Sequence, residues 1–371
     1  MGLLRSIPVR LRLPATLVAV MIVGMSLSPP AQPGPISLSG WVQAGGRSLY
    51  VATNGSDSNP GSPSAPWRTV AKGLVSVRAG DTLWVRGGTY VERIINPALH
   101  PGTPTERVMV SAYAGERPVV KGLLWLKGVM YWTFRGINVT WDPDRNQRDE
   151  HMVKMTNGVG WKYVESEIWG AHSYADLLIA SSVAGQPAEW LVARNCIHDN
   201  YGALDHVNGD QLIYVNTHDS PGGQINRNLL FNAPNGEGVK LGSSNPSEPG
   251  PNGVVVQYNT IYHTNQSILV AWTAKNNRLV RNLMVRVNLE LGPVYGNVRG
   301  YQLTGLNNVV HDNAGYEAHS LILNDRGYPG VVNGGGNVFP QGPQFDRIGC
   351  GGFHPADPTA QRYGRYAPWH P

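Results

Sequence analysis

The feature that most constrains the fold of this chain is a short phrase that recurs between residues 195 and 313. Each copy has an asparagine, a pair of hydrophobic residues and a second asparagine a few positions later. The copies begin at Asn195, Asn228, Asn259, Asn282 and Asn308. They follow one another roughly every 20 to 35 residues, which predicts a coiled, solenoid-like β chain.

Composition agrees with many short strands joined by turns. The 371 residues include Gly 45 and Pro 28, a content that disfavours long helices. Hydrophobic residues reach 41% and charged residues only 15%, so the chain is not of the disordered class.

The first 34 residues are predicted to be an export signal. Arg5, Arg10 and Arg12 precede an apolar run over 13–27 that, at about 15 residues, is short for a membrane span. An uncleaved anchoring segment is the alternative. Without the three arginines the formal charge falls from +5 to +2 (5 − 3), which gives no support to nucleic-acid binding. We therefore expect a secreted, periplasmic or cell-surface protein without a stable span in its mature form, and a monomer.

After a linker over 35–47, the chain carries one helical signal. Val70, Leu74 and Val77 are spaced for a short amphipathic helix that stops at Gly80. Ahead of a β solenoid, such a helix would cover the open apolar end of the first coil. The alternating residues of 81–90 predict the next strand.

Three stretches carry a family resemblance: Tyr50 to Tyr90, Arg107 to Val119, and Tyr131 to Ile137. The first resembles the N-terminal cap, and the others the first coils, of secreted right-handed parallel β-helix proteins of the pectate-lyase-like group. The resemblance implies an all-β, single-stranded right-handed parallel β-helix over 48–340, with a C-terminal cap or tail over 341–371. It does not specify an activity, because the same cap occurs on lyases, hydrolases, epimerases and non-catalytic proteins.

A second pattern runs between the asparagine phrases, in segments that begin at Asp176, Asp210, Glu237 and Gln266. Aligned as rungs of one sheet, these four leading residues would stack ~4.8 Å apart. Alternation then predicts that four residues point inward, namely Leu178, Leu212, Val239 and Ile268. The same alternation turns four others outward, namely Ile179, Ile213, Lys240 and Leu269.

Three stacked carboxylates repel one another unless a cation or a donor neutralises them. We therefore predict a calcium site at Asp176, Asp210 and Glu237. Asp205 in the preceding loop would add a ligand, and His206 a substrate contact. In the alternative interpretation, these acids accept hydrogen bonds from backbone amides at the strand starts.

The resemblance implies β-elimination of a uronate polysaccharide, in which calcium neutralises the sugar carboxylate and a basic side chain removes the proton. Lys240 is the predicted base, because it is the only lysine in the aligned strands. Arg281 is its predicted catalytic partner, and Arg278 and Trp272 are predicted to bind the acidic glycan. Each of these side chains also has a purely structural interpretation.

Two other functional classes stay open. A non-catalytic extracellular or cell-surface β-helix with a glycan-binding or structural role is favoured by the apolar outward positions Ile179, Ile213 and Leu269. A glycoside hydrolase or epimerase comes third, since no Asp-Asp dipeptide occurs in the chain.

The two cysteines, Cys196 and Cys350, could pair in an oxidising compartment. We favour the simpler interpretation that Cys196 is a small hydrophobic residue within a coil. Their spacing does not indicate a zinc site.

Overall fold

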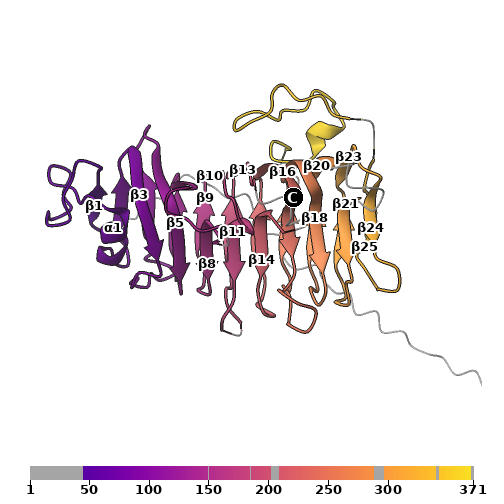
Figure 1. Cartoon of the computed structure of the whole chain (residues 1–371), viewed down its shortest axis with the longest axis horizontal. Helices are drawn as coiled ribbons and strands as arrows, with labels where there is room; N and C mark the ends of the chain where they lie inside the picture. The colour runs from indigo at the N-terminus through magenta and orange to yellow at the C-terminus, as the bar shows by residue number, and fades with distance from the viewer. Residues whose placement is uncertain are drawn as a thin grey trace, which may run out of the picture. The chain divides into compact units, whose positions relative to one another are not determined.

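The computed structural model describes residues 45–148, 150–183, 185–201, 209–287, 296–339 and 342–368, which all lie in one unit, Ser39–Pro368 (Figure 1). The predicted leader lies outside these residues. In the described part of the chain, no helix has both the length and the apolar character needed to cross a membrane.

Almost all regular structure is parallel β, arranged in successive coils. One sheet has 11 strands and the other has 14. The second sheet bends at a corner, because β5, β16 and β18 pair with different neighbours through their two halves. Each coil therefore contributes, in chain order, a strand to a first, a second and a third wall. The predicted all-β, parallel, β-helix-like architecture is confirmed.

The first wall is the 11-stranded sheet: β1 (Ser48–Val51), β2 (Thr82–Val85), β4 (Val108–Ala112), β6 (Trp132–Arg135), β9 (Lys162–Val164), β12 (Leu191–Ala193), β15 (Gln224–Asn226), β17 (Val255–Gln257), β19 (Arg278–Val280), β22 (Val309–His311) and β25 (Val332–Asn333). The second wall holds β7 (Asn138–Thr140), β10 (Glu167–Trp169), β13 (Cys196–His198), β20 (Leu283–Val287) and β23 (Ala314–Tyr316). The third wall holds β8 (Val153–Thr156), β11 (Ala175–Ala180), β14 (Gln211–Asn216), β21 (Gly296–Tyr301) and β24 (Ser320–Asn324). Four strands turn the corner between the second and third walls: β3 (Gly88–Ile95), β5 (Pro118–Lys127), β16 (Leu229–Leu241) and β18 (Thr260–Ala271).

The predicted N-terminal helix is present as α1 (Val70–Ser76). Thr69 caps it, because its side chain accepts a hydrogen bond from the Lys72 amide. Val70 and Leu74 are buried in the same apolar cluster as the inner faces of the first coils. The helix therefore covers apolar surface that no preceding coil would cover.

The recurring asparagines form a buried ladder at the corner between the first and second walls. Asn195 is fully buried. Its backbone amide and its Nδ2 both donate to Asn228 Oδ1, at 2.9 and 3.1 Å. The same pair of bonds repeats upward through Asn259, Asn282, Asn313 and Asn337. The ladder satisfies backbone amides that the turn leaves unpaired, so these asparagines stabilise the corner of each coil.

The last copy of the phrase was aligned wrongly. Asn313, and not Asn308, continues the ladder above Asn282. Asn308 instead accepts from Asn277 in a separate pair, with its Oδ1 2.8 Å from Asn277 Nδ2. Asn308 precedes Val309 and Val310, whereas Asn313 precedes Ala314 and Gly315, so the hydrophobic pair of the phrase selected the wrong asparagine.

The register predicted for the third wall is correct between β16 and β18 but wrong for β11 and β14. Glu237 lies opposite Gln266, and Lys240 opposite Leu269, as predicted. However, Gln211 rather than Asp210 lies at the level of Glu237, because Ile213 pairs with Val239. Leu178 pairs with Tyr214, so Asp176 lies two positions out of step with Asp210.

This slip reverses several predicted side-chain directions, because a one-residue shift moves a strand's side chains to the opposite face. Ile179 and Ile213 were predicted to point outward, but both belong to the central core. Leu178 was predicted to point inward, but it packs outside the core with Ala175 and Tyr214. Of the apolar positions that favoured a non-catalytic protein, Ile179 and Ile213 therefore point into the core, whereas Leu269 points outward as predicted.

The favoured interpretation of Cys196 as an unpaired residue is wrong. Cys196 on β13 forms a disulfide with Cys350, with their Cα atoms 5.8 Å apart and 154 positions between them. The C-terminal segment that carries Cys350 lies beside the second wall (Figure 1). Its Phe353 packs there with Leu229 and Phe231, so the segment covers an outer apolar patch of that wall.

Candidate functional site

The third wall carries an outward column of side chains that we call the lysine face. It comprises Trp125, Lys154, Leu178, Tyr214, Lys240, Leu269 and Arg299. Each member lies opposite the next on a neighbouring strand. Flanking residues on the same strands, such as Val239 and Leu241, belong to the core. The column is therefore the solvent side of the sheet.

Lys240 lies in a pocket on this face. The pocket has a volume of about 260 Å³ and is lined by Lys240, Gln266, Leu269, Ala271, Trp272, Arg299 and Tyr301. The Lys240 ammonium lies 4.6 Å from the ring centre of Tyr214 and 5.5 Å from that of Trp272. Two predicted residues, Lys240 and Trp272, are thus brought together.

Burial makes Lys240 a better base than an exposed lysine. Removal from water lowers the pKa of Lys240 below its ordinary 10.5, and the nearby Glu237 opposes this effect. Glu237 has no exposed surface, and burial raises its pKa to about 7, against the influence of Lys240 and Gln211. Gln211 Nε2 donates to Glu237 Oε2 at 3.0 Å.

Arg299 is a member of the site that sequence reasoning missed. Its guanidinium lies 4.9 Å from the Tyr301 ring and pairs with Asp325 through Nε and Nη2, at 3.1 and 3.0 Å. It follows the undescribed residues 288–295, where no repeat phrase marks the strand. The alternation of Val298, Arg299 and Gly300 in β21 was the available signal.

Two predicted arginines lie elsewhere. Arg278 is on β19 of the first wall, where its Nη2 lies 3.4 Å from His311 Nε2. Arg281 follows the same strand in a turn and lies over Tyr258, 5.9 Å from the ring centre. The fold therefore does not bring either arginine to the wall that carries Lys240.

The predicted calcium ligands do not form one site among the described residues. Asp176, Asp210 and Glu237 are all fully buried, and the observed register separates their levels. Burial raises the pKa of Asp176 well above its ordinary value, which favours a neutral acid. Asp205 and His206 lie outside the described residues, so their predicted roles stay predictions.

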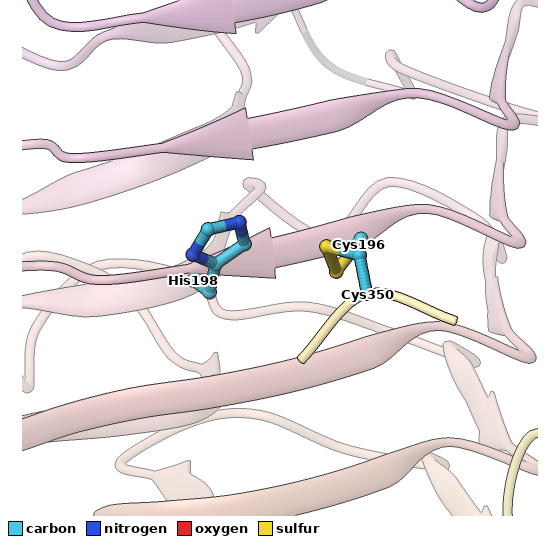
Figure 2. A group of neighbouring side chains, drawn as sticks. All are labelled: Cys196, His198 and Cys350. Atoms are coloured by element: carbon cyan, nitrogen blue, oxygen red, sulfur yellow. A yellow bond between two sulfur atoms is a disulfide. The ribbon is translucent and has the colours of Figure 1, made fainter. Parts of the chain in front are cut away.

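Among the described residues, only Cys196, His198 and Cys350 form a cluster of three metal-type ligand atoms, within 4.8 Å of one another. Figure 2 shows the His198 ring beside the bond that joins the two sulfur atoms. A disulfide sulfur is not a thiolate, so the oxidised cluster lacks the donors that zinc requires.

His198 instead contacts Glu167, which lines a second surface that we call the ion-paired groove. This groove has a volume of about 540 Å³ and includes Glu116, Arg117, Glu165, Glu167, Arg194, Arg365 and the disulfide. Arg117 pairs with Glu167. Arg86 pairs with Glu116, and Arg135 pairs with Glu165, both at 2.7 Å. The groove thus has closely matched positive and negative side chains.

His198 is held between two carboxylates. Its Nδ1 lies 2.8 Å from Asp199 and its Nε2 3.1 Å from Glu167. Burial by itself would lower the pKa of His198, but the two carboxylates raise it to about 9. The imidazolium stacks on Phe231, with ring centres 4.6 Å apart, so it acts as a fixed cation of the second wall.

Comparisons with known proteins agree with this architecture. Residues 49–210 match the family model described as the Pel9A-like, right handed beta helix region. The resemblance to pectate-lyase-like β-helix proteins is confirmed. The match ends at the level of β14, before Lys240.

Two curated proteins share shorter segments. Eighty residues are 36% identical to the uncharacterized protein YwoF of Bacillus subtilis (strain 168), covering 22% of this chain and 17% of that protein. An alignment over 132 residues is 24% identical to pectate lyase PEL9 of Emericella nidulans, covering 29% of this chain and 32% of that protein. The matched segments thus span less than a third of either relative.

Solved structures are similar over more of the chain. A crystal structure of pectate lyase Pel9A has a TM-score of 0.52 at 17% identity, covering 75% of this chain and 78% of that one. A glycoside hydrolase has a TM-score of 0.55 at 10% identity, covering 86% and 98%. At these identities the likeness concerns the fold, which lyases and hydrolases share.

Proposed function

We propose that this protein is a secreted polysaccharide lyase that cleaves uronate-containing glycans by β-elimination. In this proposal the body is a right-handed parallel β-helix, and the reaction takes place at the pocket around Lys240. The observation that carries the proposal is the position of a partly buried lysine beside Arg299 and two aromatic rings.

The chemistry needs a base and a group that stabilises negative charge on the sugar carboxylate. The neutral Lys240 amine takes the proton from the carbon that bears the carboxylate. The electrons of that C–H bond form the carbon–carbon double bond, and the glycosidic oxygen leaves with the electrons of its own bond. Arg299 pairs with the carboxylate as charge moves onto it, and Trp272 and Tyr301 pack against the sugar rings.

Calcium is a separate part of the proposal. The described acids do not fit a single calcium site, so the mechanism above uses only Lys240 and Arg299. If Asp205 and its neighbours supply the missing ligands, calcium would neutralise the carboxylate in addition to Arg299. A chelator will therefore abolish activity if calcium is needed and leave it unchanged if Arg299 suffices.

A glycan-binding protein without turnover is the second candidate. It is favoured by the two aromatic rings around the Lys240 ammonium, since contact with π faces stabilises the charged form of an amine. A hydrolase is less well supported, because the residues that line the Lys240 pocket include no carboxylate.

One assay separates the three possibilities. The full chain is incubated with polygalacturonate, alginate and glycosaminoglycans, and both unsaturated uronate ends and reducing ends are measured. The lyase proposal expects both kinds of end in equal amounts from at least one polymer, and none with Lys240→Met. Reducing ends without unsaturation would indicate a hydrolase, and binding without any new ends would overturn the lyase.

A further inference from the structure

The lysine face extends well beyond the Lys240 pocket. Three strands before Lys240, at the other end of the column, Lys154 lies opposite Trp125. The path from Lys154 through Leu178 and Tyr214 to Lys240 has three steps, or roughly 14 Å at the usual spacing of strands. This second position is outside the pocket and has no part in the chemistry proposed above.

The geometry at Lys154 repeats that at Lys240. The Lys154 ammonium lies 5.3 Å from the centre of the Trp125 ring. The indole is fixed, because its Nε1 donates to the His151 carbonyl at 2.6 Å. Tyr174, which is 38% exposed, lies on the next coil with its ring 6.1 Å from His151. A flat, partly exposed aromatic surface beside a cation is the arrangement that binds an anionic sugar.

Charge distinguishes this position from most of the surface. No described carboxylate forms an ion pair with Lys154, Lys240 or Lys127, the exposed lysine two residues beyond Trp125. By contrast, Lys121 and Lys275 pair with acids, at 3.4 and 3.0 Å. Burial lowers the pKa of Lys154, and the charge of Lys127 lowers it further. These three lysines of the third wall thus have no ion-paired carboxylate in the described part of the chain, whereas Arg299 at the far end of the column pairs with Asp325.

We propose that Trp125, Lys154 and Lys127 form a distal subsite for the same acidic polysaccharide, so that an extended uronate chain binds along the column. The lysines pair with its carboxylates, and the indole face stacks on a sugar ring. The inference rests on the proposed function for the identity of the ligand, but it concerns binding at a distance from the reacting bond. Such a subsite would favour long chains over short ones.

The test compares short and long ligands on matched variants of the full chain. Lys154→Gln removes the charge with little change in size, and Lys154→Arg keeps it. The control is Lys72→Gln, because Lys72 also lies over an indole, 5.9 Å from the centre of Trp67, but on the N-terminal helix. Trigalacturonate and hexagalacturonate serve as ligands, with the corresponding guluronate oligomers as a second series.

With Lys154→Gln, we expect KM for the hexamer to rise roughly tenfold while kcat changes little, because an ion pair and a cation–π contact are lost away from the reacting bond. The trimer should be unaffected, Lys154→Arg should restore most of the loss, and Lys72→Gln should behave as the wild type. Equal effects on trimer and hexamer, or no effect on either, would overturn the subsite.

The subsite can be tested even if the protein does not cleave the oligomers. If the wild type cleaves no oligomer, the same variants are compared by calorimetric binding of the hexamers. Weaker hexamer binding with Lys154→Gln then supports the subsite although the lyase has failed. Cleavage that is indifferent to Lys154 supports the lyase and removes the subsite.

Discussion

The lysine face and the ion-paired groove are both charged surfaces of the same coiled chain, but their charged side chains have different neighbours. In the groove, Arg117 and Arg194 meet Glu167 and Glu165. On the lysine face, Lys154 and Lys240 lie over aromatic rings, and no carboxylate among the described residues forms an ion pair with either. Exposed ion pairs add little to stability, and an unpaired, partly buried amine costs stability. This difference is the reason that the proposals above assign the ligand to the lysine face and not to the groove.

The largest expected effect directly tests the contrast between the lysine face and the ion-paired groove. Lys240→Met should lower the rate of elimination by about 10²–10⁴-fold, because it removes the proposed base. Arg117→Met, which removes a charge from the ion-paired groove, should change the rate by less than about twofold. Rates of unsaturated-product formation measure both. A loss with Arg117→Met as large as that with Lys240→Met would indicate that the active site lies in the ion-paired groove.

The pH profile sharpens the same contrast. The base must be unprotonated, so the rate should rise with pH through the lowered pKa of Lys240 and level off before the ordinary 10.5. The profile of kcat/KM is the measurement. An acidic limb that persists unchanged in Lys240→Arg would show that another group supplies the base.

The next effect concerns the tail that borders the groove. Replacing Cys196 and Cys350 together by serine should lower the free energy of unfolding by about 2–4 kcal/mol, because a link across 154 residues restricts the unfolded chain. Urea denaturation measures the loss. Activity below the unfolding transition should be retained, since the disulfide lies on the second wall and Lys240 on the third. Loss of activity in the folded variant would show that the ion-paired groove affects catalysis at the lysine face.

His198 gives a pH-dependent test of the groove. Its pKa is about 9 in the folded protein and 6.5 ordinarily, so its stabilising contribution is complete below pH 6.5 and is lost as pH rises to about 9. The loss is at most about 3 kcal/mol, because its carboxylate partners are partly exposed. Denaturation of the wild type and His198→Gln across this range isolates the effect, and identical slopes would contradict it.

The smallest effect is expected for an exposed pair of the groove. Arg135→Gln breaks the contact with Glu165 but should change the free energy of unfolding by less than about 1 kcal/mol. Chemical denaturation at low and high salt provides the measurement. A larger, salt-sensitive loss would show that the paired charges act as a network, and that the groove contributes more to stability than its separate contacts indicate.

Much of the architecture could be predicted from local patterns. The asparagine phrases predicted coils because each copy places a short apolar strand beside a polar corner residue, and Asn228 shows how the corner is satisfied. Val70 and Leu74 predicted the capping helix because helical spacing is a property of neighbouring residues. Lys240 was found by its parity with Val239 in one strand, which no distant residue alters.

The arrangement of the site was decided by tertiary structure. Whether Asp210 or Gln211 lies level with Glu237 depends on the length and path of the turns between coils, and one residue of difference reverses a face. The pairing of Cys196 with Cys350, and the approach of Arg299 to Lys240, likewise depend on where the chain returns after many residues. The sequence by itself determined which strands form and which of their residues alternate. Only the stacking of coils decided which side chains meet, because contacts between rungs join residues that no local period relates.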